Sequence, residues 1–298
     1  VGSAALATNT TADNNTAVGR NSLLVNTTGA SNVAIGASAL TTNTTASNNT
    51  AVGTNACLYT TTGYAITALG TSALQANTTG NQNTAIGYQA SVANTTGANN
   101  VAVGAYALDA NTEGDNNVAI GLSSLGSNTT ADNNTAVGKN ALHENTTGDE
   151  NTAIGTNALD ANTTGADNVA VGVNALSANT TASNVAVGRT ALEVNTTGAN
   201  LTAVGRDALA SNTTGANNTA IGYQSGKAII IGTNNTAVGK DALIGDDYGN
   251  HSTAIGHASL YKQNTAGTSA VGIGNTAVGS YSGYYNVTGV GNTHIGFE

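Results

Sequence analysis

The stretch NTAVGKNALHENTTGDE, residues 134–150, is one copy of a unit that fills almost the whole chain. Its glycine, Gly138, belongs to a series in which an aliphatic residue always precedes the glycine and the glycines stand 17 residues apart. Fifteen of the seventeen steps have this length, and the exceptions are 16 residues (Gly172 to Gly188) and 23 residues (Gly256 to Gly279). Such a short, strict period is typical of one small structural unit copied end to end.

The length of the unit selects the kind of repeat. Seventeen residues are too few for a helical hairpin repeat, which needs about 34 residues, and Gly, Asn and Thr are poor helix formers. They suit one turn of a β-solenoid, with short strands joined by tight corners and coils stacked about 4.8 Å apart. We therefore predict an all-β fold, a parallel β-solenoid (β-roll) of about 17 coils that spans residues 1–298 as a single repeat array.

Each column of the repeat has a predicted role. Gly138 follows a short strand and is expected to turn a corner with a backbone conformation that other residues resist, and Gly148 marks a second corner. Asn is the usual residue at the columns of Asn134 and Asn145. Stacked asparagines can form hydrogen-bonded ladders along the solenoid, and Asn also tolerates the left-handed conformation at turns.

The strand predicts a surplus of apolar surface. Neighbouring strand residues point to opposite faces, so Val137 and its column face one way while Ala136 and its column face the other. The Leu142 column adds further apolar surface to a coil with a narrow interior. One apolar face must therefore lie outside the coil, where a long exposed stripe would be unusual for a monomer. We expect copies to associate along the axis, as a parallel homotrimer.

Composition and charge exclude several classes of protein. Only 8% of the residues are charged, and the seven Lys and Arg residues among 298 give no basic patch for nucleic acid. No apolar run approaches the roughly 18 residues of a membrane span.

Because the sequence starts at Val1 inside a repeat, we expect it to be a segment of a longer protein. Cys57 is the single cysteine and stands where most copies have Leu, so we predict a buried, unreactive side chain.

The irregular coils are the candidates for local function. Residues 223–232 (YQSGKAIIIG) replace the Leu and NTT positions, which indicates either local repacking of the core or a docking site for another protein. Residues 245–251 (GDDYGNH) carry two adjacent carboxylates that could bind a cation, although calcium prefers six to eight oxygen ligands. The extra residues within 257–278 predict a bulging loop. The terminal coil, 280–298, concentrates three tyrosines that we expect to cap the open edge.

Catalysis is not predicted. His143, His251, His257 and His294 are scattered, without the spacing of a metal site or the order of a catalytic triad. The glycines form neither a phosphate-binding loop nor a dinucleotide fingerprint, because both need a following helix. We therefore assign no catalytic, cofactor-binding or metal-binding residues and expect no cofactor.

The motifs NNTAVG, NVAIG and NTTG resemble the head repeats of YadA-like trimeric autotransporter adhesins. They resemble still more closely the NNTAIG…AL…NTTG arrays of bacterial and phage tail-fibre-domain proteins, and the resemblance covers essentially the whole chain. It implies a trimeric parallel β-roll in an extracellular fibre, at a cell surface or on a virion, that attaches to a surface. It names neither a ligand nor a receptor.

Two questions stay open at this point. The paired threonines, such as Thr146 and Thr147, allow an alternative in which Thr and Asn ladders bind ice or carbohydrate. Eleven copies also carry the tripeptide N-T-T (Asn9, Asn26, Asn43 and onward), which is formally a site of N-glycosylation. An outward Asn could carry a sugar, whereas an inward Asn in a ladder could not.

Overall fold

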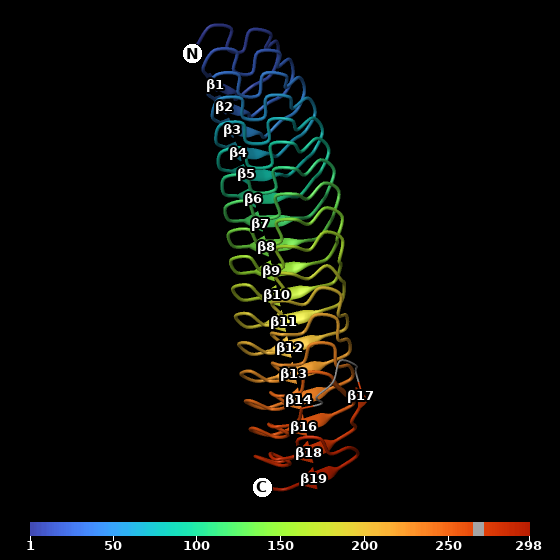
Figure 1. Ribbon diagram of the computed structural model, residues 1–298. Coiled ribbons are helices and arrows are strands. Elements are labelled where there is room, and N and C mark those ends of the chain that lie inside the picture. The colour runs from blue at the N-terminus through green and yellow to red at the C-terminus, as the bar shows by residue number, and fades with distance from the viewer. Residues whose placement is uncertain (265–270) are drawn as a thin grey trace. The chain divides into compact units, whose positions relative to one another are not determined.

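The computed structural model describes residues 1–264 and 271–298 and has an all-β architecture. The chain forms a parallel β-solenoid of about 16 turns with a repeat of about 17 residues, and the described residues include no helix. Each turn contributes one short strand to the stack (Figure 1). The sequence therefore predicted the fold class, the repeat length and nearly the number of turns.

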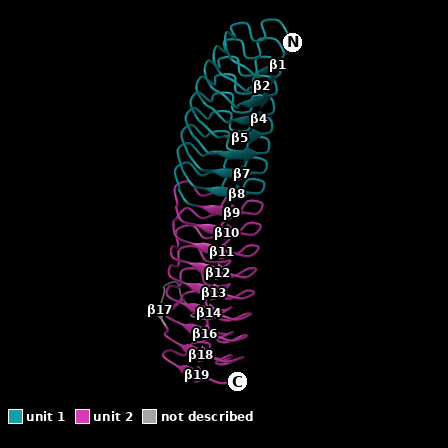
Figure 2. Cartoon of the chain, turned by 180° about the vertical axis from the view of Figure 1, so that it is seen from behind, with its two compact units in different colours: residues 1–150 teal, residues 151–298 magenta. Residues whose placement is uncertain are grey.

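The chain divides into two compact units, residues 1–150 and 151–298 (Figure 2). The strands of the first unit are β1 (Thr16–Val18), β2 (Val33–Ile35), β3 (Thr50–Val52), β4 (Thr67–Leu69), β5 (Thr84–Ile86), β6 (Val101–Val103), β7 (Val118–Ile120) and β8 (Thr135–Val137). The strands of the second unit are β9 (Thr152–Ile154), β10 (Val169–Val171), β11 (Val185–Val187), β12 (Thr202–Val204), β13 (Thr219–Ile221), β14 (Thr236–Val238), β15 (Gly249–Asn250), β16 (Thr253–Ile255), β17 (Val271–Gly272), β18 (Thr276–Val278) and β19 (Thr293–Ile295).

The strands pair in parallel and in register with the repeat. In the first unit Ala17 faces Ala34 across the β1–β2 pair, and the same match continues along the stack. In the second unit the register survives the short step, where Ala170 pairs with Ala186. It also survives the long step, where β16 pairs with β18, while the separate strands β15 and β17 pair beside the main stack. Length changes are therefore absorbed between the strands.

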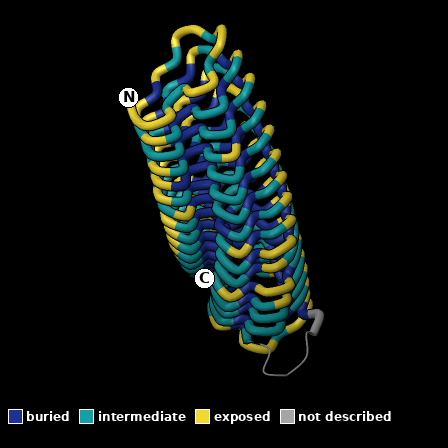
Figure 3. The backbone as a smooth tube through the Cα atoms, turned by 90° about the horizontal axis from the view of Figure 1, so that it is seen from above, coloured by how far each residue is buried: buried dark blue, intermediate teal, exposed yellow. Residues whose placement is uncertain are grey.

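The interior of each unit is built from the same columns. The middle residue of nearly every strand is an alanine with almost no exposure, and the Leu column is fully buried. The two asparagine columns complete the interior on the other side of the coil. In Figure 3 the buried part of the backbone recurs at the same places from coil to coil. The core thus combines aliphatic columns with columns of buried amides.

The corners require unusual backbone conformations, and the first one requires glycine. Gly53 has φ +139°, and a Cβ there would overlap the carbonyl oxygen of Gly70 in the next coil. Three further positions of the repeat are left-handed without being glycine: Asn133 has φ +60°, and Asn140 and Leu142 both have φ +54°. A left-handed Leu costs about 1–2 kcal/mol, and complete burial of its side chain offsets this cost. The left-handed leucines were not predicted, because leucine has no preference for this conformation.

Candidate functional surface

The outer face of the strands carries a continuous aliphatic row in each unit. We call the third residues of the strands the aliphatic column. Side chains alternate between the two faces of a strand. The middle residue of nearly every strand is an alanine that points inward, so the third residue points outward. Leu69 and Ile120, for example, are 47% and 39% exposed. The prediction of two apolar strand faces is confirmed for the single chain, and the aliphatic face is the one left uncovered.

The asparagines of the NTT tripeptides lie inside the coil and form a ladder. The Asn94 Nδ2 donates to Asn77 Oδ1 (2.8 Å) in the neighbouring coil and to the carbonyl oxygen of Gly97 (3.0 Å). The second asparagine column also links coils, since Asn83 Oδ1 accepts from the backbone N–H of Asn100 (2.9 Å). Both predicted ladders are therefore present, and the NTT asparagines that would have to carry N-linked sugar are buried, except Asn9, which is half-buried.

The paired threonines of the NTT tripeptides differ from each other in the coil. The first hydroxyl is used inside the stack: Thr95 Oγ1, for example, donates to the carbonyl oxygen of Thr112 (2.9 Å). The second threonine, such as Thr96, is exposed. Only one threonine of each pair is thus left to make a regular outer row, and Ile231 interrupts that row in the second unit.

The irregular coil 223–232 is repacked internally. Gly226 takes the Leu position with φ +59°, and the Ile229 Cδ1 lies 3.1 Å from the place where a Cβ of Gly226 would stand. Ile229 itself takes the ladder Asn position and is buried, while Ile230 and Ile231 are half-buried. The isoleucine thus occupies space next to the missing leucine. This geometry matches local repacking and leaves little apolar surface for a docking site.

The acidic coil 245–251 places Asp246 in the ladder and not in a cation site. The Asp246 Oδ1 accepts from the backbone N–H of Gly249 (3.0 Å), and its Oδ2 accepts from Gln263 Nε2 (2.7 Å). Asp247 is half-buried and points into no cluster of ligands. Within residues 1–264 and 271–298, no group of three His, Cys, Asp or Glu side chains is arranged to hold a metal ion.

The predicted loop within 257–278 lies partly outside the described residues, because residues 265–270 are not among them. The described residues that follow it form β17, which pairs in parallel with β15 at Gly249 and Asn250. The backbone N–H of Ile273 donates to the carbonyl oxygen of Asn250 (3.1 Å). The inserted segment therefore returns to the stack before β18.

The single cysteine is buried as predicted. Cys57 has no exposed surface and occupies the Leu position of its coil. Burial raises the pKa of its thiol from the ordinary 9.0 to about 12, and a hydrogen bond with Thr60 offsets only part of this effect. Because the thiolate is the reactive form, we expect the folded chain to protect this thiol from reagents.

The four histidines stay apart. His143 Nδ1 lies 3.0 Å from the carbonyl oxygen of Ser123, His251 is exposed, and His257 packs edge-on against Tyr281. His294 takes the alanine position of β19, and its ring reaches the place where Gly283 leaves the Leu position empty. The carboxylate of Glu144, the next residue, lies 3.6 Å from His143 Nε2.

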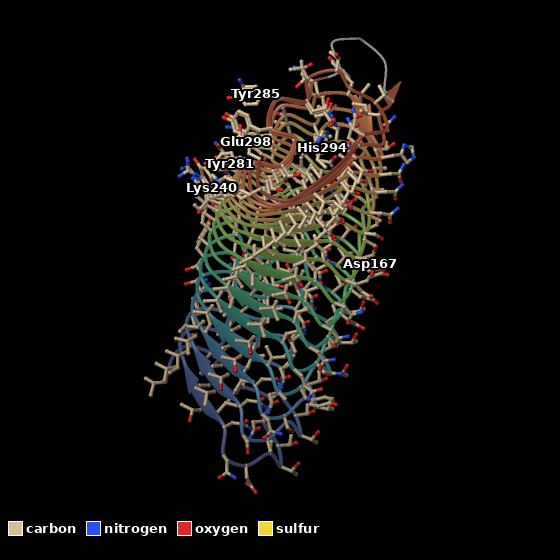
Figure 4. All side chains as sticks on the ribbon, turned by 90° about the horizontal axis from the view of Figure 1, so that it is seen from below. Asp167, Lys240, Tyr281, Tyr285, His294 and Glu298 are labelled. Atoms are coloured by element: carbon tan, nitrogen blue, oxygen red, sulfur yellow. The ribbon has the colours of Figure 1, made fainter. Side chains whose placement is uncertain are left out.

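Aromatic side chains of the last two coils form a cluster, of which the sequence predicted only the three tyrosines of the terminal coil. We define the aromatic cluster as Tyr261, Tyr281, Tyr284 and Tyr285, together with Lys262. The Tyr261 and Tyr284 rings are stacked with centroids 4.9 Å apart, and Lys262 Nζ lies 4.5 Å from the centroid of the Tyr285 ring. Figure 4 shows Tyr281 and Tyr285 on the same side of the solenoid end.

No protein family and no curated protein matches the chain. No helix of membrane-spanning length and hydropathy occurs in the described part of the chain. The resemblance of the repeat motifs to fibre and adhesin repeats therefore remains a prediction from the sequence.

Proposed function

We propose that this chain is a segment of an extracellular structural or adhesive fibre that associates with copies of itself, as a homotrimer, through the aliphatic column. The observation that carries the proposal is the exposure of this column in both units, while the alanine face fills the interior. A row of outward aliphatic side chains makes a contiguous apolar patch, whereas the exposed apolar groups of most protein surfaces are scattered singly.

A second copy of the chain is the natural cover for this row. It presents the same side chains at the same spacing, one per coil, so that two copies can match coil for coil along their length. Most homo-oligomers have closed symmetry, and a cyclic arrangement of parallel copies would bring this row of every copy to the common axis. The low charge supports close association, because few charged groups would need to be desolvated. The trimer, the extracellular location and the adhesive role are supported by the resemblance of the motifs NNTAVG and NTTG.

The test replaces part of the column without touching the interior. Changing Leu69, Ile86 and Ile120 to Thr keeps strand-forming residues but removes apolar surface. We expect the far-UV circular dichroism to stay that of a β-protein while light scattering shows loss of the oligomer. A wild-type chain that is a soluble monomer at micromolar concentration would refute the proposal.

The matched control removes a similar amount of exposed aliphatic surface elsewhere. Leu122, Val173 and Val194 are 45%, 45% and 42% exposed but lie outside the aliphatic column. Their replacement by Thr should leave the oligomer intact. Equal dissociation in both triple variants would mean that the column has no special role.

An ice-binding role is the second candidate, and we place it on the strand face and not on the NTT row. The first hydroxyl of the NTT pair, as in Thr78 and Thr95, is used within the stack, so the NTT row is a poor lattice for ice. On the strand face, by contrast, threonines such as Thr84 point outward beside the aliphatic column. Thermal hysteresis of the purified chain, with loss on replacing Thr84, would favour this candidate over self-association.

A further inference from the structure

Most positively charged side chains of this chain occupy one column of the repeat. Five of the seven Lys and Arg residues stand directly after the corner glycine, and we call this position the basic column: Arg20, Lys139, Arg189, Arg206 and Lys240. All five are exposed, and the column holds no Asp or Glu. Exposure alone does not explain the concentration, because the column of Thr96 is also outward and carries no Lys or Arg.

Acidic side chains gather before the strand. One residue, usually a buried Asn, precedes each strand of the main stack, and we call the two positions before it the acidic margin. The backbone N–H of Asp115 donates to Asp132 Oδ1 (2.6 Å), and that of Asp132 donates to Asp149 Oδ1 (2.8 Å). Carboxylates one coil apart, at about 4.8 Å, repel one another unless a cation lies close to them. The margin holds no Lys or Arg and six of the sixteen acidic residues, which are Asp13, Asp115, Asp132, Asp149, Glu150 and Asp167.

The basic column and the acidic margin bracket the outward strand face. In one coil of the first unit, Asp132 comes before β8 and Lys139 comes after it, with Val137 of the aliphatic column between them. Figure 4 shows Lys240 and Asp167, which belong to the same two columns, on opposite sides of the second unit. The aliphatic column is therefore flanked by opposite charges.

The cations of the two units differ in their partners within the chain. In the second unit, Arg206 and Lys240 lie 3.4 Å and 3.5 Å from the carboxylate of the aspartate that follows each of them. In the first unit, Arg20 and Lys139 form no ion pair with any described residue. The charges of Arg20 and Lys139 are thus open to a partner.

The symmetry of a parallel assembly brings the two flanks together. When parallel copies surround a common axis at the aliphatic column, one flank of each copy meets the opposite flank of the next copy, which is a heterologous contact. The basic column of one copy then faces the acidic margin of its neighbour. An antiparallel pair with its strand faces opposed would place each column against itself, and like charges across an interface are unfavourable.

We propose that Lys139 of one copy pairs with Asp132 of the next copy, and Arg20 with Asp13, and that these pairs fix the direction and the axial register of the assembly. This pairing rests on the proposed self-association and supplies what the aliphatic column lacks. Every coil presents one Val, Ile or Leu in that column, so a slip by one coil changes the apolar contact little.

The charges of the first unit, by contrast, distinguish one register from the others. Without a slip, coil faces like coil, and both cations meet an aspartate. A slip by one coil moves Lys139 to Asp149 but moves Arg20 from Asp13 to Ala30. A slip repeated at every contact also gives an open filament, whereas matched coils close a ring. The charge pairs therefore favour the closed assembly.

A zero-length cross-linker tests the pairing on the unaltered chain. A carbodiimide activates a carboxylate, and a Lys amine displaces the activating group as a urea, so that an amide bond forms where the two groups already touch. We expect a linked peptide pair that joins Lys139 Nζ to Asp132. When isotope-labelled and unlabelled chains are assembled together, this pair should contain one peptide of each kind. On a denaturing gel the products should end at the trimer.

The matched control keeps the charge and removes the amine. Lys139→Arg should give the same oligomer in light scattering but lose the linked peptide. Lys139→Glu should weaken association at least about tenfold, and Lys139→Asp combined with Asp132→Lys should recover most of the loss. These changes should leave the fold intact, because Thr156 and Ala98 stand in the same two columns. Circular dichroism checks the fold of each variant.

Light scattering separates failure of this pairing from failure of self-association. An oligomer in which Lys139 is linked to no carboxylate of another chain would overturn the pairing and leave self-association standing. Products larger than a trimer that are linked through Lys139 would overturn the fixed register. Unchanged association of Lys139→Glu would show that the charge has no role. A monomeric wild-type chain would overturn both proposals.

Discussion

Replacing Gly53 by alanine should open the coil that contains Cys57. Gly53 turns the first corner with φ +139°, and a Cβ there would overlap the carbonyl oxygen of Gly70 in the next coil. The corner cannot relax easily, because the N–H of Gly53 donates to the carbonyl oxygen of Ile35 (2.8 Å) and that of Gly70 donates to Val52 (2.8 Å). The backbone is thus pinned on both sides of the new methyl group.

The size of the effect follows from the positive φ of Gly53 and from the overlap of the new Cβ with the carbonyl oxygen of Gly70. A non-glycine residue in such a sparsely populated conformation costs about 1–3 kcal/mol, and the overlap with a pinned carbonyl adds to it. We therefore expect Gly53→Ala to lower the free energy of opening this coil by at least about 3 kcal/mol. At about 1.4 kcal/mol per factor of ten, the population of the open coil should rise more than about a hundredfold.

Cys57 provides a local reporter for this opening. Its thiol is fully buried and its pKa is raised to about 12, so a thiol reagent reacts only after the coil opens. The rate of labelling without denaturant then measures the open population when opening is fast and reversible. A local readout is needed because stacked repeats need not unfold in one step.

The control is a second glycine in the same coil. A Cβ built on Gly63 stands 2.5 Å from the carbonyl oxygen of Gly80, much as at Gly53, but the φ of Gly63 lies outside the left-handed region. Ala46 and Ala131 already occupy this column and are buried, so the stack accommodates a methyl group there. Gly63→Ala should therefore change the labelling rate less than about tenfold. An effect of Gly63→Ala as large as that of Gly53→Ala would refute the reasoning.

Three further predictions follow from the interior. The Cys57 thiol keeps its proton up to about pH 12 in the folded chain but loses it near pH 9 in the unfolded chain. The free energy of unfolding should therefore be unaffected by this group below pH 9 and fall by about 1.4 kcal/mol per pH unit above it. The Cys57→Ala variant, unfolded by denaturant at the same pH values, should lack this slope. Gly226→Leu and Ile229→Asn should each destabilise the second unit, while the double variant should recover on the order of 1–3 kcal/mol of the summed loss in a double-mutant cycle; additive losses would show that the two positions are not packed together. Asn94 is buried in its ladder, so a sugar attached to it would prevent the coils from stacking. Secretion from a host that glycosylates NTT should therefore give a chain without a β-type circular dichroism spectrum, and blocking the glycosyltransferase should restore that spectrum. A product that is both folded and glycosylated would contradict the ladder.

The fold could be predicted from the sequence because its main determinants are local and repeated. The 17-residue period limits each unit to one short coil, and the glycine before Lys139 recurs where only glycine fits. The asparagine ladders followed from the same regularity, since Asn134 and Asn145 stand at fixed distances from that glycine. The aromatic cluster could be foreseen only as a group of tyrosines in the terminal coil, because the stacking of Tyr261 on Tyr284 joins two different coils.

The sequence by itself determined that the chain forms stacked coils with two apolar strand faces, because side chains alternate along a strand and both columns are apolar. It could not determine which face is inside. The tertiary structure decided that the alanines point inward, where the strand lies close to the buried Leu142 column and leaves room only for a methyl group. The larger Val137 column is consequently on the surface. Tertiary packing also decided that Asp246 joins the ladder through Gln263, since a hydrogen bond between coils depends on positions that no local pattern specifies.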